Sequence, residues 1–138
     1  MPMLIAMLAI AAAWSAQPAR DGALIDGNWT SPSGNVVVTI APCGAAMCGR
    51  VSWASDRAKA DARRGGTDPL IGTELLTDFT ATRNGRWKGR LFVPDLNRRS
   101  RAELSLVDTD RIKISGCMVG RMLCKSQLWV RSTGDAAP

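Results

Sequence analysis

Short segments in which apolar and charged residues alternate constrain this 138-residue chain more than any other feature. Trp87, Leu91 and Val93 fall on one face of such a segment, and the basic residues between them fall on the other. Ile112 and Ile114 alternate with basic residues in the same way. Successive side chains of a β-strand point to opposite faces, so this period of two predicts strands with one buried face and one basic, exposed face.

The pattern recurs in about eight segments that turn residues separate. We expect strands near residues 24–30, 35–42, 47–54, 73–82, 86–93, 101–107, 111–118 and 123–131. Turn sequences such as SPSGN and PDLN lie between them, and the Asn84-Gly85 pair is a strong hairpin signal. The sequence therefore predicts an all-β domain with antiparallel strands, either a single up-and-down barrel of about eight strands or a closed sandwich, because closure removes exposed strand edges.

Residues 55–69, SDRAKADARRGGTDP, are the exception to this alternation. They are rich in Ala, Arg and Asp and have room for a short helical turn. We expect them to form the longest loop, lying over one mouth of the barrel. Long loops often carry function, although a solvated linker is an equally good interpretation.

The first segment predicts export. Residues 1–17 carry no charge, and residues 4–13 form an apolar run followed by small residues. This run is too short to span a bilayer and is typical of a signal peptide, although basic residues are missing before it. We expect a signal peptide over residues 1–19 with an uncertain cleavage site, one domain over residues 20–138, a periplasmic or secreted location, and no transmembrane segment in the mature chain. A buried N-terminal helix is the alternative.

The four cysteines are expected to pair in an oxidising compartment. A hairpin loop over residues 44–47 would place Cys43 opposite Cys48, and Cys117 and Cys124 flank a second turn. We expect these two local disulfides, and the long-range pairings 43–117 with 48–124 or 43–124 with 48–117 are the alternatives. Spacings of C-x4-C and C-x6-C without histidine favour neither a zinc site nor a redox centre. No metal and no cofactor are predicted.

The residue inventory argues against an enzyme. The chain has no histidine and no tyrosine, and four paired cysteines leave no free thiol. Carboxylates such as Glu74, Asp78 and Asp95 are available, but nothing near them in the sequence marks a catalytic pair. We therefore predict no catalytic residue and a non-enzymatic function.

The formal charge of +6 and a pI near 9.8 suggest anionic partners or simply solubility. Export makes nucleic acid a poor candidate. The basic strand faces could instead attract an anionic envelope surface, and we expect a monomer. The residues concerned are Arg86, Lys88, Arg90, Arg111 and Lys113.

The sequence GNW at residues 27–29 and Arg131 in LWVR resemble the lipocalin and calycin layout. In that layout a G-x-W motif opens the barrel and an arginine near the last strand packs over the tryptophan. The resemblance implies that Gly27, Trp29 and Arg131 close one end of the barrel. An arginine stacked on an indole adds a cation–π contact and can donate to open backbone carbonyls.

A wider resemblance covers Gly27 to Arg131. The combination of CGxxxCGxVxW with GCxxxxxLCxxxxW, together with PLIGTELLTDF and RWKGRLFVPD, resembles an uncharacterised exported bacterial family, the domain of unknown function 2147. The resemblance implies a lipocalin-like barrel and supplies no reaction. The family usually carries a Gly and an aromatic residue after the Pro94-Asp95 turn, where this chain has Asn97 and Ser100, so a pocket here would be more polar on that side.

These features favour a protein that binds a small apolar or amphiphilic ligand inside a barrel. The candidate ligand-binding residues are Trp53, Trp87, Trp29 and Leu91, since aromatic and apolar side chains on inward strand faces can line a pocket. The alternative is an interaction protein, such as a hydrolase inhibitor or an envelope accessory factor, that acts through loops at the mouth.

Overall fold

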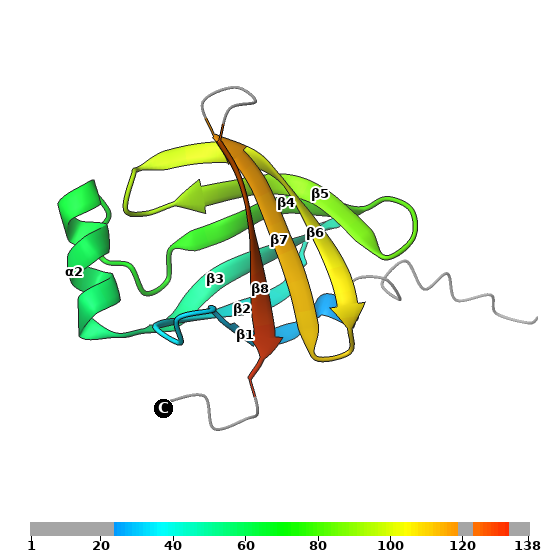
Figure 1. The fold of residues 1–138 in the computed structure, drawn as a ribbon, viewed down its shortest axis with the longest axis horizontal. Helices are drawn as coiled ribbons and strands as arrows, with labels where there is room; N and C mark the ends of the chain where they lie inside the picture. Colours follow the sequence, from blue (N-terminus) through cyan, green and yellow to red (C-terminus); the bar gives the residue numbers. More distant parts are fainter. Residues whose placement is uncertain (1–23, 119–122, 133–138) are drawn as a thin grey trace, which may run out of the picture.

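The computed structural model describes residues 24–118 and 123–132, and their strands form one closed barrel. Eight antiparallel strands follow one another around the barrel in sequence order, and β8 pairs with β1 (Figure 1). The predicted single up-and-down barrel is therefore confirmed. The strands are β1 (Gly27–Thr30), β2 (Val36–Cys43), β3 (Ala46–Ala54), β4 (Glu74–Ala81), β5 (Arg86–Val93), β6 (Arg98–Asp108), β7 (Arg111–Met118) and β8 (Leu123–Arg131).

The strand bounds differ most from prediction in β1, which begins three residues later than expected, and in β6, which begins three residues earlier. Pairing with β5 continues to Val93 and Arg98, across a tight turn in which Asn97 has a positive φ of 50°. Three arginines among the first four residues of β6 hide the alternation that marks the other strands. The side of the barrel that Ser100 occupies is therefore regular sheet and not loop.

Residues 55–69 were expected as a loop with a short helical turn, but most of them form the helix α2 (Asp56–Gly65). The Ser55 side chain caps the helix by accepting a hydrogen bond from the Ala58 backbone N–H, and Gly66 ends it in a left-handed conformation. Ala58 and Ala62 form the buried face. As predicted, the segment lies over one mouth of the barrel (Figure 1). Alanine and arginine are strong helix formers, so this segment forms a helix and not a loop.

Both local disulfides are present, so the predicted connectivity is confirmed. Cys117 and Cys124 are direct cross-strand partners on β7 and β8. The predicted position of Cys43 opposite Cys48 is wrong, because the β2–β3 turn is shorter than expected. Cys43 pairs with Ala46 across a two-residue turn that starts at Gly44, whose φ is 66°, and the disulfide runs diagonally across the hairpin.

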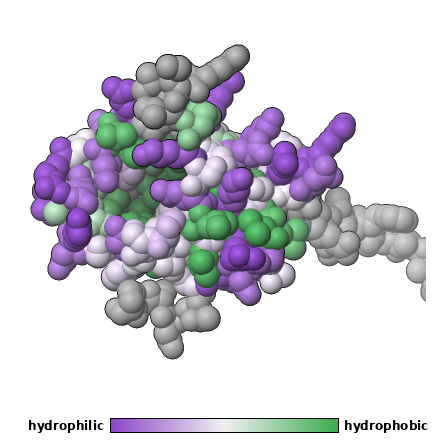
Figure 2. Space-filling view, in the orientation of Figure 1, coloured by the Kyte–Doolittle hydropathy of each residue, from purple (hydrophilic) through white to green (hydrophobic). Residues whose placement is uncertain are grey.

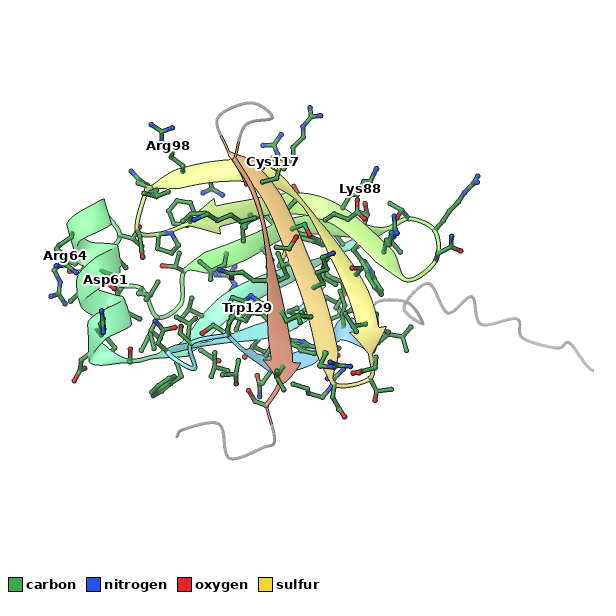
Figure 3. The ribbon with its side chains drawn as sticks, viewed as in Figure 1. Asp61, Arg64, Lys88, Arg98, Cys117 and Trp129 are labelled. Atoms are coloured by element: carbon green, nitrogen blue, oxygen red, sulfur yellow. A yellow bond between two sulfur atoms is a disulfide. The ribbon has the colours of Figure 1, made fainter. Side chains whose placement is uncertain are left out.

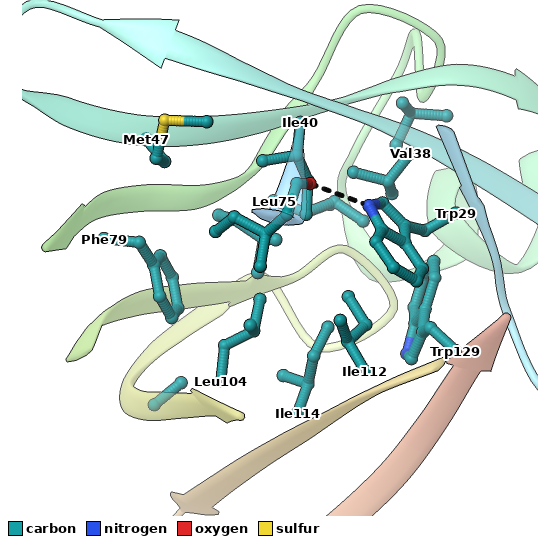
Figure 4. Packing of buried hydrophobic residues seen from close by; sticks show 14 of the residues in the cluster. Trp29, Val38, Ile40, Met47, Leu75, Phe79, Leu104, Ile112, Ile114 and Trp129 are labelled. Carbon is teal, nitrogen blue, oxygen red and sulfur yellow. Dashed lines mark hydrogen bonds between the residues drawn. The ribbon is translucent and has the colours of Figure 1, made fainter. Parts of the chain in front are cut away.

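The interior is filled with large side chains toward the end of the barrel away from α2. Figure 4 shows Trp29, Phe79, Leu104 and Ile112 among the buried residues that fill it. Gly89 supports this packing, because a Cβ there would lie 2.6 Å from the Phe79 ring. Interior packing is therefore dense at one end, which leaves any hollow at the other.

Candidate ligand cavity

The end of the barrel near the start of β1 is sealed by Arg131 and Trp29. The Arg131 guanidinium lies over the Trp29 ring, 4.2 Å from its centroid. The guanidinium and its Nε donate hydrogen bonds to three backbone carbonyls, those of Leu24, Asp26 and Thr109, at 2.8–3.0 Å. One side chain thus covers the buried indole and satisfies backbone groups that the end of the barrel leaves open.

Two further details complete this closed end. The Trp29 indole N–H donates to the Ile25 carbonyl at 2.9 Å, so the polar atom of a fully buried ring is satisfied (Figure 4). Gly27 has a φ of 126°, and a Cβ there would lie 2.8 Å from the Arg131 guanidinium. Glycine is therefore needed at this position both for backbone conformation and for space.

A cavity of about 730 Å³ occupies the interior between this sealed end and the mouth beside α2. Its size lies within the range of small-molecule sites. Its wall combines an apolar interior with polar residues at the mouth. In the space-filling view, hydrophobic surface shows in a hollow beside α2 (Figure 2). The apolar residues lining it include Trp29, Val36, Val38, Ile40, Leu75, Leu76, Leu91, Ile112, Ile114 and Trp129.

The pairing that closes the barrel between β1 and β8 is short. Strand β1 pairs with β8 only at Trp29 and Thr30, whereas residues 123–129 of β8 pair with β7 alone. Lys125 and Gln127 lie on this stretch, which pairs on one side only. Both are exposed and line the cavity together with residues of the β1–β2 turn. Exposed polar side chains of β8 and residues of the β1–β2 turn therefore form part of the cavity wall.

The charged groups at the mouth are arranged asymmetrically. Asp61 of α2 and Asp95 of the β5–β6 turn line one side, and Lys125 lines the wall formed by β8. Burial raises the pKa of the Asp95 carboxyl, and the Asp61 charge raises it further, whereas Arg64 lowers it. Arg64 forms an ion pair with Asp61 on α2 (Figure 3). The two carboxylates of the mouth thus lie near α2, where Arg64 offsets the charge of Asp61, and the lysine of the cavity wall lies on β8.

The position of α2 over the mouth is fixed by close packing against the β5–β6 turn. A Cβ on Gly65 would collide with the Asp95 carbonyl, and the Thr67 hydroxyl donates to the Pro94 carbonyl at 3.0 Å. Ala58 and Asp61 then face the cavity. The helix is therefore part of the cavity wall.

Two of the four candidate ligand-binding residues line the cavity. They are Trp29, at its sealed end, and Leu91 of β5. Trp87 points inward as its alternation predicts, but it is 1% exposed and belongs to the packed core instead of the cavity wall. That Trp29 and Leu91 contact a ligand stays a prediction.

The expected inward orientation of Trp53 is wrong. A β-bulge between Val37 and Val38 of β2 makes Val38 pair with Val51 and Val37 with Trp53, which leaves Ser52 without a partner in the register. Directly paired residues share a face, and Val38 faces the cavity, so Val37 and Trp53 lie on the outer face. One extra residue reverses the alternation, and no turn residue in the sequence marks it.

Sequence reasoning missed three cavity residues on β8, namely Lys125, Gln127 and Trp129. They alternate along the strand, and Trp129 points into the interior (Figure 4). The alternation of these three residues, which ends in the buried Trp129, could have indicated that they face inward. Residues 124–128 are exposed, however, and polar residues occur on both faces of the strand, so the inward face does not stand out in the sequence.

The residues considered for other roles lie elsewhere. Glu74 pairs with Arg50 at 3.3 Å, and neither Glu74 nor Asp78 lines the cavity. All of the outward basic residues are exposed, as expected. Arg86 pairs with Glu103 and Arg111 with Asp108, so acids offset part of that charge. Binding to an anionic envelope surface stays a prediction, and the expected signal peptide lies outside the described residues.

Comparison with solved structures places this barrel in a known class. It is similar to a structure described as "Protein HP1028 from the human pathogen Helicobacter pylori belongs to the lipocalin family". The TM-score is 0.61 at 10% identity, over 80% of this chain and 84% of that one. The eight-stranded closed barrel therefore has a lipocalin-like fold, and at this identity the likeness concerns the fold alone.

The sequence itself identifies the family. Residues 27–131 match the family described as "Uncharacterized protein conserved in bacteria (DUF2147)", and the chain belongs to that family. No curated protein matches the chain. Within the described residues, no helix has the length and apolar character needed to cross a membrane.

Proposed function

We propose that this protein is an exported, non-enzymatic barrel that binds a small apolar or amphiphilic ligand. The observation that carries the proposal is the cavity of about 730 Å³, with apolar walls and polar groups gathered at its mouth. A sealed end, an apolar interior and a charged mouth suit a molecule with one apolar and one polar part.

The fold and the disulfides support the proposal. The barrel resembles a protein described as belonging to the lipocalin family. Two disulfides are typical of proteins that mature in an oxidising compartment, which supports a periplasmic or secreted location. The cavity wall contains no histidine, cysteine or tyrosine, and this supports binding without catalysis.

A second candidate function is an interaction with a partner protein through the mouth. The observation that favours it is the exposed basic face of α2, where Arg57, Arg63 and Arg64 project beside the mouth. An acidic partner surface would suit these charges, two of which face acids, namely Arg63 toward Asp68 and Arg64 toward Asp61. Such a partner should be lost when Arg57 and Arg63 are changed to Ser, while ligand binding should persist.

Ligand binding can be tested by titrating the oxidised protein with a hydrophobic dye and with fatty acids. We expect a change in tryptophan fluorescence that depends on Trp129, which lines the cavity, and not on the outward Trp53. Trp129→Phe should therefore reduce the response to the part that Trp29, the other tryptophan of the cavity wall, contributes, and Trp53→Phe should keep the whole response. A wild-type protein that responds to no dye and no fatty acid would contradict the proposal.

A blocking variant gives a second test. Val36 lines the cavity near the mouth, so Val36→Phe should fill part of it and weaken dye binding about tenfold. Val130 is 50% exposed and does not line the cavity, so Val130→Phe is the matched control and should bind normally. Equal binding by the two variants would place the dye outside the cavity.

A further inference from the structure

Ser100 of β6 contributes a hydroxyl group to the region of the cavity. Its oxygen is buried and has no hydrogen-bond partner, and Ser100 lines the cavity. Buried polar groups in folded proteins are nearly always hydrogen-bonded, so an unsatisfied one in a cavity wall calls for an explanation. A polar atom of a ligand would supply the missing partner.

Gly116 of β7 packs closely against this hydroxyl. A Cβ at Gly116 would lie 3.3 Å from the Ser100 oxygen and 3.5 Å from Leu91. A side chain at this position would therefore crowd the hydroxyl. Gly116 itself lines the cavity, and its φ is not in the left-handed region, so backbone conformation does not demand glycine here.

The next strand places a positive charge beside the same space. Lys125 of β8 is the direct cross-strand partner of Gly116, so both face the cavity. Lys125 forms no ion pair with any residue in the described part of the chain. Neighbouring strands lie about 4.8 Å apart, so a lysine side chain can reach the space above Gly116 from β8, while the Ser100 hydroxyl reaches it from β6.

Gln127 adds a further donor on this wall. Its side-chain oxygen accepts a hydrogen bond from the Trp129 indole N–H at 3.2 Å. That contact fixes the amide orientation and leaves the Gln127 NH₂ group to donate. Ser100 offers a hydroxyl on β6, and Lys125 and Gln127 offer an ammonium and an amide donor on β8, the strand on the other side of β7.

We propose that this wall, defined by Ser100, Gly116, Lys125 and Gln127, binds the carboxylate of a long-chain carboxylic acid whose alkyl chain lies in the apolar cavity. The inference rests on the proposed ligand-binding function and names its ligand class. A carboxylate has two oxygens, one for the Ser100 hydroxyl and one for the Lys125 ammonium, and charge-assisted hydrogen bonds are the stronger kind. Asp61 and Asp95, the two acids that line the mouth, leave Lys125 as the cation of the cavity wall.

The test compares laurate with 1-dodecanol, which has the same chain length and no charge, by calorimetric titration of the oxidised protein. We expect wild type to bind laurate at least tenfold more tightly than dodecanol. Ser100→Ala and Lys125→Met should each weaken laurate binding about five- to tenfold and leave dodecanol binding unchanged. Gly116→Val should weaken laurate binding at least as much, because its side chain crowds the hydroxyl.

The matched control is Lys113→Met, which removes an exposed lysine from β7 that does not line the cavity. Its laurate affinity should equal that of wild type. Equal affinity of wild type for laurate and dodecanol, or laurate binding unchanged in Lys125→Met and Ser100→Ala, would overturn this inference and leave the proposed function standing. Binding of neither compound would overturn both.

Discussion

The two ends of the barrel differ in whether their polar side chains have hydrogen-bond partners. At the closed end the indole N–H of Trp29 has a partner, and the Arg131 guanidinium binds three carbonyls and the face of a ring. At the open end the Ser100 hydroxyl has no partner and the Lys125 ammonium pairs with no described residue. Satisfied polar groups stabilise a fold, whereas unsatisfied ones in a cavity are available to a ligand.

The largest effect expected from this comparison concerns stability at the closed end. Trp29→Ala removes a fully buried indole, its hydrogen bond and the surface on which Arg131 stacks. We expect it to lower the free energy of unfolding by about 3–5 kcal/mol. Chemical denaturation would measure this, with Trp53→Ala, on the outer face, as the milder control. An equal loss of unfolding free energy in both variants would contradict a special role of Trp29 in the closed end.

A second prediction concerns the support of the mouth. A side chain at Gly65 would collide with the Asp95 carbonyl, so Gly65→Ala must move α2 away from the β5–β6 turn. We expect a loss of about 3 kcal/mol in the free energy of unfolding, the upper end for overpacking, together with altered dye affinity. Gly72→Ala is the comparison without a collision: a Cβ there meets nothing within 4 Å, so its φ of 90° makes any loss one of backbone strain, and its dye affinity should be unchanged. Unchanged dye affinity in Gly65→Ala would show that α2 does not shape the cavity.

A third prediction separates charge from geometry at the closed end. Arg131→Lys keeps the positive charge but loses the planar fork that reaches several carbonyls at once. We expect a loss of about 2 kcal/mol in the free energy of unfolding, since backbone acceptors lose their donors. Ligand affinity should stay at the wild-type value, as measured by dye titration. A stability equal to that of wild type would mean that charge alone closes this end.

The smallest effects are expected from two aspartates with opposite pKa shifts. The hydrogen bond from Arg111 lowers the pKa of Asp108 in the β6–β7 turn, so its contribution to stability is present above the ordinary value of 3.8 and is lost as pH falls through the lowered pKa. Burial raises the pKa of Asp95 at the mouth, so the folded state favours its neutral form and loses that stability as pH rises.

At pH 7 we therefore expect Asp108→Asn to lower the melting temperature slightly and Asp95→Asn to leave it equal or slightly higher. Melting curves between pH 2 and pH 7 would measure both variants. The difference between wild type and Asp108→Asn should shrink as the pH falls. Shifts of the same sign at pH 7 would contradict the assignment of opposite environments to the two carboxylates.

The predictability of the site from the sequence differs from one strand to the next. Alternation alone placed Leu91 and Trp87 inward, because β5 pairs regularly with β6 along its whole length. It failed for Trp53, because the bulge in the β2–β3 pair shifts the register by one residue and reverses the face. The alternation of apolar residues did not identify Lys125 and Gln127, because residues that line an exposed part of the cavity wall need not be apolar.

The sequence by itself determined an all-β domain of about eight antiparallel strands, and it favoured a barrel and two local disulfides, because a period of two, turn residues and cysteine spacing are local properties of the chain. Only the tertiary structure decided where the interior is hollow. That depends on which side chains meet across the barrel: Phe79, Trp87 and Leu104 fill one part, whereas Gly116, Ser100 and the stretch of β8 that pairs on one side only leave another part open. Volume left between residues distant in sequence has no local signature.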